Sequence, residues 1–241
     1  LQDLRFRSLE KRDGAKELLH QVQRLLNDGL LPDGATVDKV DPDGLWVRRG
    51  SSVVELKELS DGYRVAIAIV LDLIRHIHDA FGGLDVKPGG EGVLQVHRGG
   101  VVLIDEVDAH LHVSWQKTVG FWLTRRFPNV QFLVTTHSPF PCQAASPSGL
   151  FLLPGPGEPR GVRVADEDTY RRVVNGTADD AVCSELFGLD SPRSDRAEEL
   201  RDQYTRLRAK QLRSGLSPKE SRALRTLKRQ LPLEFDAPAA E

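Results

Sequence analysis

Hydrophobic and polar positions recur along this chain with two different periods, and each period predicts a type of element. Apolar residues at helical spacing across 9–31 predict a helix that ends at the Leu-Pro-Asp-Gly of 31–34. Three short strand-like runs follow at 36–40, 45–48 and 52–56, separated by turn residues. That spacing predicts a small antiparallel meander.

The middle of the chain predicts a strand–helix–strand unit. The stretch 60–80 is apolar nearly all round and predicts a buried helix. After a Gly/Pro-rich loop, the apolar run 101–104 is typical of a strand buried on both faces. A helix over 111–127 and a second such strand at 131–135 complete a βαβ unit, so we expect a parallel sheet.

Beyond residue 145 the pattern changes. Four prolines surround the apolar run 150–153, which we expect to form an edge strand. The stretches 191–215 and 217–231 predict a helical hairpin. Ser217 and Glu220 have the spacing of a capping box at the start of its second helix.

Composition excludes several classes of protein. Two cysteines in 241 residues, without CxxC spacing, argue against a disulfide scaffold and a thiolate zinc site, and they favour a reducing compartment. No apolar run approaches the roughly 20 residues of a membrane span. The formal net charge of −2 gives no general reason to expect nucleic acid.

Polar residues that could carry chemistry follow both predicted parallel strands. Asp105 and Glu106 come directly after the run 101–104, and His137 follows the next strand. Because ligands bind at the carboxyl ends of parallel strands, we expect the three to lie close together. Adjacent carboxylates can divide two tasks, holding Mg²⁺ and activating water. The alternatives are an acidic turn and a loop histidine bonded to backbone.

A third candidate opens the buried helix. Leu-Ser-Asp-Gly-Tyr-Arg spans 59–64, with Ser60 as the predicted N-cap and Gly62 exposing backbone amides. Such a helix start can bind an anion. The alternative is an ordinary N-cap.

Taken in order, these three motifs resemble those of ABC-type ATPases. The resemblance is to the soluble branch that includes RecF, the structural-maintenance-of-chromosomes proteins and the OLD-type or AAA-like ATPases of bacterial defence. The stretch 105–116, Asp-Glu-Val-Asp-Ala-His-Leu-His-Val-Ser-Trp-Gln, is especially similar to the last group. The resemblance implies an α/β fold, a partial P-loop NTPase sheet core with a small antiparallel meander and a helical C-terminal extension. It places the ATPase domain at 1–145 and the extension at 146–241.

The resemblance also implies roles for individual residues. Asp105 matches the Walker B aspartate near Mg²⁺, Glu106 the catalytic glutamate, and His137 the switch histidine that senses the γ-phosphate. The signature motif, which contacts ATP on the opposite protomer, matches the residues Ser60, Asp61 and Gly62. His112 ends the loop that crosses the dimer interface, where most members of the family carry aspartate.

The phosphate-binding loop is the missing part of the pattern. No Gly-x-x-x-x-Gly-Lys-Ser/Thr occurs in the chain, and there is no methionine, even at position 1. We therefore expect an N-terminal Walker A lobe upstream, and ATP hydrolysis with Mg²⁺ only together with that lobe and a second protomer. The expected setting is the cytoplasm, with no membrane association. A nuclease or another effector in DNA repair or phage defence stays open as partner.

Two other interpretations stay open at this stage. One is a metal-dependent hydrolase with a six-residue metal site, made of Asp105, Glu106, Asp108, His110, His112 and His137. The other is a non-catalytic interaction module. The stretch 201–230 also carries ten Lys/Arg against two acidic residues, so it could contact nucleic acid or be a solvated helix face.

Overall fold

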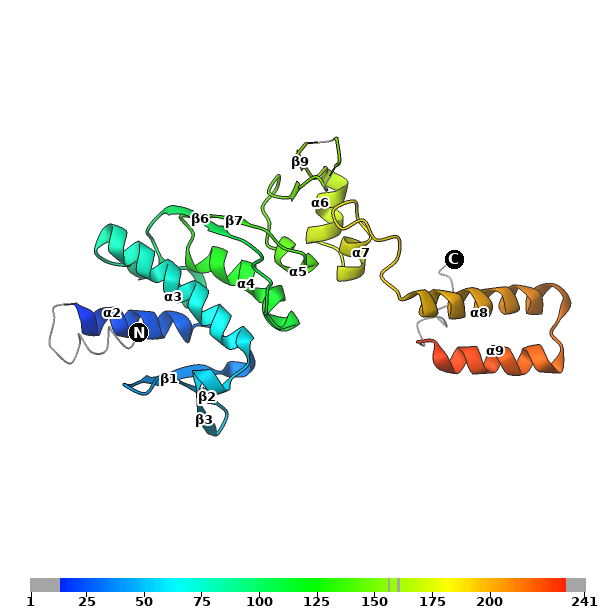
Figure 1. Ribbon diagram of the computed structural model, residues 1–241, viewed down its shortest axis with the longest axis horizontal. Coiled ribbons are helices and arrows are strands. Elements are labelled where there is room, and N and C mark those ends of the chain that lie inside the picture. Colours follow the sequence, from blue (N-terminus) through cyan, green and yellow to red (C-terminus); the bar gives the residue numbers. More distant parts are fainter. Residues whose placement is uncertain (1–13, 156, 160, 233–241) are drawn as a thin grey trace. The chain divides into compact units, whose positions relative to one another are not determined.

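The computed structural model describes residues 14–155, 157–159 and 161–232 (Figure 1). These residues belong to two compact units, Leu1–Ala181 and Val182–Glu241. The division falls later than the expected domain boundary at 145/146. One reason is that the hydroxyl of Tyr170 donates to the carbonyl of Ala145 at 3.1 Å, which ties the segment after residue 145 to the first unit. The boundary of the ATPase domain itself stays a prediction.

The first unit contains strands and helices in mixed order (Figure 1). Its strands are β1 (Thr36–Val40), β2 (Leu45–Arg49), β3 (Ser52–Glu55), β4 (Val86–Pro88), β5 (Leu94–Val96), β6 (Gly100–Ile104), β7 (Val130–Val134), β8 (Phe151–Leu152) and β9 (Arg163–Val164). Its helices are α2 (Ala15–Leu26), α3 (Asp61–Phe81), α4 (Val113–Arg126), α5 (Pro139–Cys142), α6 (Glu167–Val174) and α7 (Ala178–Val182), which ends at the division, with short 3₁₀ turns at Pro32–Gly34, Leu56–Glu58 and Gly90–Gly92.

The predicted meander is confirmed. Strands β1, β2 and β3 pair antiparallel in chain order. The first helix is confirmed over Ala15–Leu26, but its predicted end at 31–34 is wrong, because residues 27–30 form turns with Gly29 in the left-handed region. The part of its predicted range before residue 14 lies outside the described residues. Strands β8 and β9 pair antiparallel, so the predicted edge strand is present but shorter.

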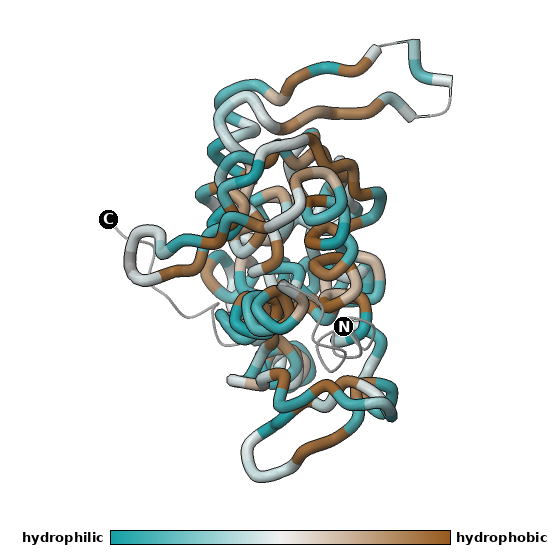
Figure 2. The backbone as a smooth tube through the Cα atoms, turned by 90° about the vertical axis from the view of Figure 1, so that its left-hand side faces the viewer, coloured by the Kyte–Doolittle hydropathy of each residue, from teal (hydrophilic) through white to brown (hydrophobic). Residues whose placement is uncertain are grey.

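Helix α3 is half-buried rather than apolar all round, which corrects the prediction. Buried residues recur along one side at helical spacing, from Gly62 to Ile77. Arg64, Asp72 and Arg75 lie on the exposed side. In Figure 2, hydrophobic and hydrophilic residues alternate within the coils of the helices. The exposed charged positions confine the buried face to one side.

Helix α4 is anchored on the turn that follows α2. Three of its side chains donate to carbonyls of this turn. Trp115 Nε1 donates to the Leu30 oxygen at 2.8 Å, and Trp122 Nε1 to the Asp28 oxygen at 2.9 Å. The buried Arg126 guanidinium donates to the Asp28 oxygen at 2.7 Å and pairs with its carboxylate at 3.1 Å. These bonds hold α4 along its length, and the start of this helix borders the candidate site.

Strands β6 and β7 form the predicted parallel pair, with Val102 opposite Phe132, and α4 connects them. Their burial differs from the prediction. Val102 and Phe132 pack on the main core, whereas Val101 is 61% and Leu103 78% exposed. Within the described ranges only these two strands make up the sheet, and nothing covers its second face. The continuous apolar run could not reveal this, because it has the same composition on both faces.

The segment between α3 and β6 was expected to be a loop, and it contains a short hairpin. Strands β4 and β5 pair antiparallel there, with Val86 opposite Val96. Leu94 and Val96 are buried in the main core. Their three-residue length and the surrounding glycines hid the hairpin from pattern analysis.

The second unit contains the predicted helical hairpin, α8 (Asp195–Ser214) and α9 (Pro218–Gln230). Its own small core consists of Tyr204, Leu227 and Leu231. The capping box of Ser217 and Glu220 is confirmed. Of the helices in the described ranges, none combines the length and apolarity that a membrane span requires.

Candidate functional site

The carboxyl ends of β6 and β7 bring two polar loops together, as expected for neighbouring parallel strands. Thr135, directly after β7, joins them. Its hydroxyl donates to Asp105 Oδ1 and accepts from the backbone nitrogen of Glu106 at 2.8 Å, and its carbonyl accepts from the nitrogen of Val107 at 3.0 Å. Thr135 has no role of its own among the predictions from sequence. Its place at the same strand end as His137 was the signal that could have identified it.

Glu106 has a left-handed backbone conformation, with φ of 49°. Such a conformation costs a non-glycine residue about 1–2 kcal/mol. The bond from its nitrogen to Thr135, together with the bond from the Ala109 nitrogen to its carbonyl at 2.9 Å, stabilises this turn. The carboxylate is exposed at the end of the strand. Strain of this kind occurs at functional sites, and here it sets the direction of the Glu106 side chain.

Asp108 connects the loop after β6 with the loop that carries His137. Its Oδ1 accepts a hydrogen bond from the Thr136 hydroxyl and another from the backbone nitrogen of His137 at 3.3 Å. The His137 side chain itself is exposed. The structure therefore fixes the main chain of His137 relative to the carboxylate pair and leaves its imidazole accessible.

Gln116 of α4 makes a second connection between the same loops. Its Nε2 donates to the carbonyl of Leu111 at 2.9 Å, and its Oε1 accepts from the Ser138 hydroxyl at 2.8 Å. Neither Gln116 nor Asp108 was predicted from sequence to connect the loops. The two hydrogen bonds of Gln116 could not be predicted from sequence, because their partners, Leu111 and Ser138, lie in loops before and after α4.

The start of α3 packs against the start of α4. Gly62 is buried, and a Cβ atom there would lie 2.8 Å from Trp115 Cζ3 and 3.2 Å from the carbonyl of His110. The ring of Tyr63 meets that of Trp115 edge-on, with centroids 4.6 Å apart. Gly62 therefore has a packing reason to be glycine, beside any contact with a phosphate.

The remaining residues of this helix start are exposed. Ser60 occupies the N-cap position, but its side chain makes no capping hydrogen bond. Asp61 forms an ion pair with Arg64 one turn later. The hydroxyl of Ser60 is thus not engaged by its own helix, as contact with an anion requires.

His112 has a local role as N-cap of α4. Its Nδ1 accepts from the nitrogen of Ser114 at 3.3 Å and lies 3.0 Å from the Ser114 hydroxyl. His110, two residues earlier, has a left-handed backbone with φ of 62°. The loop from Val107 to His112 is therefore a compact turn that ends in a helix cap.

The metal-dependent hydrolase interpretation requires several metal ligands close together. No three His, Cys, Asp or Glu side chains gather to hold a metal ion in the described ranges, which include all members of the six-residue metal site. That hydrolase interpretation therefore has no geometric support. Asp105 fits Mg²⁺, which takes one or two carboxylates and completes its shell with water and phosphate oxygens.

Cys142 contacts the loop that carries His137. Its Sγ is 3.7 Å from the carbonyl of Ser138. Burial, with a contribution from the nearby Asp108 carboxylate, raises the pKa of the thiol to about 11. A neutral thiol is neither a nucleophile nor a metal ligand at pH 7.

Residues 5–140 match the model of a protein family described as "AAA domain, putative AbiEii toxin, Type IV TA system". The matched range includes residues 59–64, the two carboxylates Asp105 and Glu106, and His137.

Curated relatives are also similar to this chain. The "Retron Vc95 probable ATPase" of Vibrio cholerae serotype O1 biovar El Tor is 32% identical over 129 residues, 52% of this chain and 24% of the relative. The Septu protein PtuA of Bacillus thuringiensis is 30% identical over 156 residues, 65% of this chain and 38% of the relative. The chain thus spans well under half the length of these relatives.

A solved structure from a study of ATP-driven dimerization and DNA-stimulated activation of SMC ATPases is also similar. It has a TM-score of 0.45 and 16% identity, and the match covers 66% of this chain and 90% of that one.

Proposed function

This chain belongs to the AAA domain family that its residues 5–140 match, and from that membership we propose that it supplies the catalytic half of an ATPase site. The resemblance to ABC/AAA-like ATPases of the defence and repair branch is confirmed by the family and by relatives named as probable ATPases. The proposed reaction is Mg²⁺-dependent hydrolysis of ATP. The observation that carries the proposal is the joining of the carboxylate pair and the His137 loop through Thr135 and Asp108.

Each residue at the strand ends has a proposed task. Asp105 holds Mg²⁺ through its carboxylate, with Thr135 donating to one oxygen to orient it. Glu106 accepts a proton from the attacking water as general base. His137 contacts the γ-phosphate, with its main chain held by Asp108. Mg²⁺, when bound, neutralises charge that develops on the phosphate oxygens.

The phosphate-binding loop is proposed to come from a Walker A lobe outside these 241 residues. The motif is absent from the sequence, and without its backbone amides and lysine most contacts to the triphosphate are missing. The exposed side chains of Val101 and Leu103 support this, because they form an apolar sheet face of the kind that another layer covers.

A second protomer is proposed to complete the site. Ser60, Asp61 and Gly62 would contact ATP held by the partner, and the loop that ends at His112 would lie at the interface. Ser60 is exposed and its hydroxyl makes no capping hydrogen bond, which supports this arrangement. The proposed setting is cytoplasmic, with ATP controlling an effector in DNA repair or phage defence.

The test is ATP turnover by a longer protein that carries a phosphate-binding loop upstream of residue 1. Replacing a general base lowers turnover by about 10²–10⁴-fold, so Glu106→Gln should abolish measurable hydrolysis while ATP still binds. Glu167→Gln, at an exposed position on α6, is the matched control and should keep full turnover. If neither the parent nor Glu106→Gln binds ATP, the ATPase proposal fails, and a non-catalytic interaction module replaces it.

A further inference from the structure

The hairpin of α8 and α9 buries most of its apolar residues between the two helices, whereas Leu212 of α8 is exposed. Tyr204, Leu227 and Leu231 form the core, and Leu200, Leu207 and Leu224 pack against it. Because the facing sides of the helices are apolar, the charged residues of the hairpin lie on its outer surfaces.

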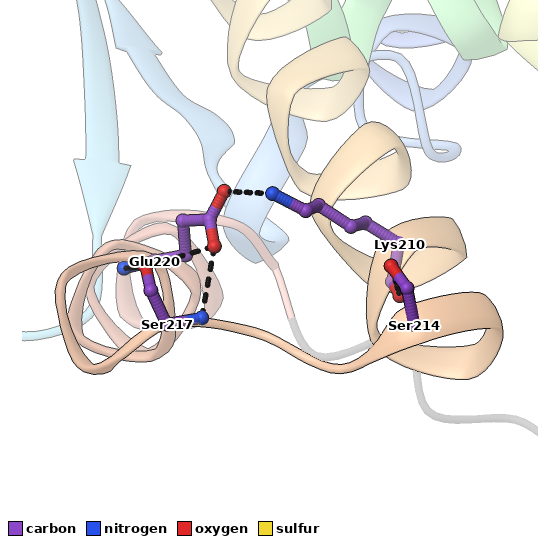
Figure 3. A network of polar contacts seen from close by, with 4 residues as sticks. All are labelled: Lys210, Ser214, Ser217 and Glu220. Atoms are coloured by element: carbon purple, nitrogen blue, oxygen red, sulfur yellow. Dashed lines mark hydrogen bonds and ion pairs between the residues drawn. The ribbon is translucent and has the colours of Figure 1, made fainter.

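The turn of the hairpin is fixed by one carboxylate (Figure 3). Glu220 accepts hydrogen bonds from the backbone nitrogen of Ser217 at 2.9 Å, from its hydroxyl at 2.8 Å and from Lys210 Nζ at 2.5 Å. These bonds, with that from Lys210 the strongest, lower the pKa of Glu220 to about 2. Lys210 and Glu220 thus neutralise each other, and the acidic residue of α9 is not available to its arginines.

Three arginines of α9 form a row on one face of the helix. Arg222, Arg225 and Arg229 have the spacing i, i+3 and i+7, so they follow one another along about 10 Å of helix surface. All three are exposed, and among the residues that the structure describes none of them pairs with a carboxylate. We call these three residues the basic row.

We propose that the basic row binds the phosphate backbone of a nucleic-acid duplex. The planar guanidinium group donates two parallel hydrogen bonds to phosphate oxygens, and a duplex presents such anions at close, regular spacing. Tyr204 is the only aromatic residue between 195 and 230, and it is buried. Bases of a single strand therefore find no stacking partner on this surface.

The composition of the helix face favours nucleic acid over an acidic protein. Protein interfaces depend on buried apolar or aromatic anchors at their centre. No large hydrophobic side chain is exposed on α9, all of whose residues are described. The basic row offers charge and hydrogen-bond donors alone, which suits recognition of a backbone without regard to sequence.

The test measures binding of a fluorescent DNA duplex of about 20 base pairs to the full 241-residue chain at several salt concentrations. The variant replaces all three arginines of the basic row by glutamine, which keeps helix propensity. The matched control makes the same change at Arg196, Arg206 and Arg213, exposed positions of α8. Circular dichroism verifies that both variants keep their helices.

Each lost phosphate contact lowers the affinity for the duplex about tenfold at 0.1 M salt. It also reduces the slope of log affinity against log salt concentration by about 0.9. We expect both losses in the glutamine variant of the basic row. The slope should be nearly unchanged in the α8 control, and it should be retained when lysine replaces the three arginines. Absence of duplex binding by the parent, or equal losses in both glutamine variants, overturns the proposal. A polyglutamate peptide that binds through the basic row, while the duplex does not compete, also overturns it in favour of an acidic protein partner.

Discussion

The packing of Gly62 against Trp115 gives the sharpest prediction about the start of α3. In a Gly62→Ala variant the new Cβ would lie 2.8 Å from Trp115 Cζ3, 3.1 Å from Cε3 and 3.2 Å from the carbonyl of His110. The indole cannot withdraw easily. Its Nε1 donates to the Leu30 oxygen at 2.8 Å, and its ring meets that of Tyr63.

The magnitude is the difference of two opposing effects. Inserting a methyl group into a packed interior costs about 1–3 kcal/mol. Alanine in place of glycine within a helix stabilises the folded state by about 0.5–1 kcal/mol. Because the indole is held on two sides, we expect the steric cost to dominate, and stability to fall by about 1–2 kcal/mol.

Urea unfolding followed by tryptophan fluorescence measures this change. The three tryptophans, Trp46, Trp115 and Trp122, all belong to the first unit, so the signal reports its unfolding. With a urea dependence of about 1–3 kcal/mol per M, the midpoint should fall by about 0.5–1 M. Gly83→Ala is the matched control, since nothing lies within 4 Å of a Cβ there. Its midpoint should not fall.

Repeating Gly62→Ala in a second variant isolates the contact between residue 62 and Trp115. Trp115→Phe removes the ring atoms that the new methyl group meets, so Gly62→Ala should cost less there, with a coupling energy of about 1 kcal/mol. An unchanged midpoint for Gly62→Ala in the parent would refute the packing argument. The same cost in both backgrounds would show that Trp115 is not the cause.

Two more predictions concern hydrogen bonds. Gln116→Leu leaves the Ser138 hydroxyl and the Leu111 carbonyl without their partner, and we expect a loss of about 1–3 kcal/mol in urea unfolding; a stable variant would contradict this. The pKa of Glu220 is lowered from 4.5 to about 2 in the folded hairpin. Its ionised carboxylate therefore stabilises the hairpin fully at pH values above 4.5. Relative to Glu220→Gln, the parent should therefore have more helix by circular dichroism at pH 7, and this advantage should disappear as the pH falls from 4.5 to about 2. A difference that does not change with pH would argue against this role of the carboxylate.

The sequence by itself determined the order of the principal elements and the polar residues at the ends of the two parallel strands. Periodicity gave the meander, α3, the β6–α4–β7 unit and the hairpin, because local spacing sets which residues share a face. Periodicity did not predict the β4–β5 hairpin, because its three-residue strands are too short to show a repeating pattern. The positions of Asp105, Glu106 and His137 followed from one rule, that neighbouring parallel strands end at the same edge of a sheet.

Only the tertiary structure decided which faces are covered and which side chains meet. The apolar residues of β6 look alike in sequence, yet Val102 packs on the core and Leu103 is 78% exposed. The bonds of Thr135 to Asp105, of Asp108 to the His137 loop, and the approach of Gly62 to Trp115 join residues from separate elements. Periodicity records only a residue's neighbours along its own helix or strand, whereas these contacts depend on how the elements pack.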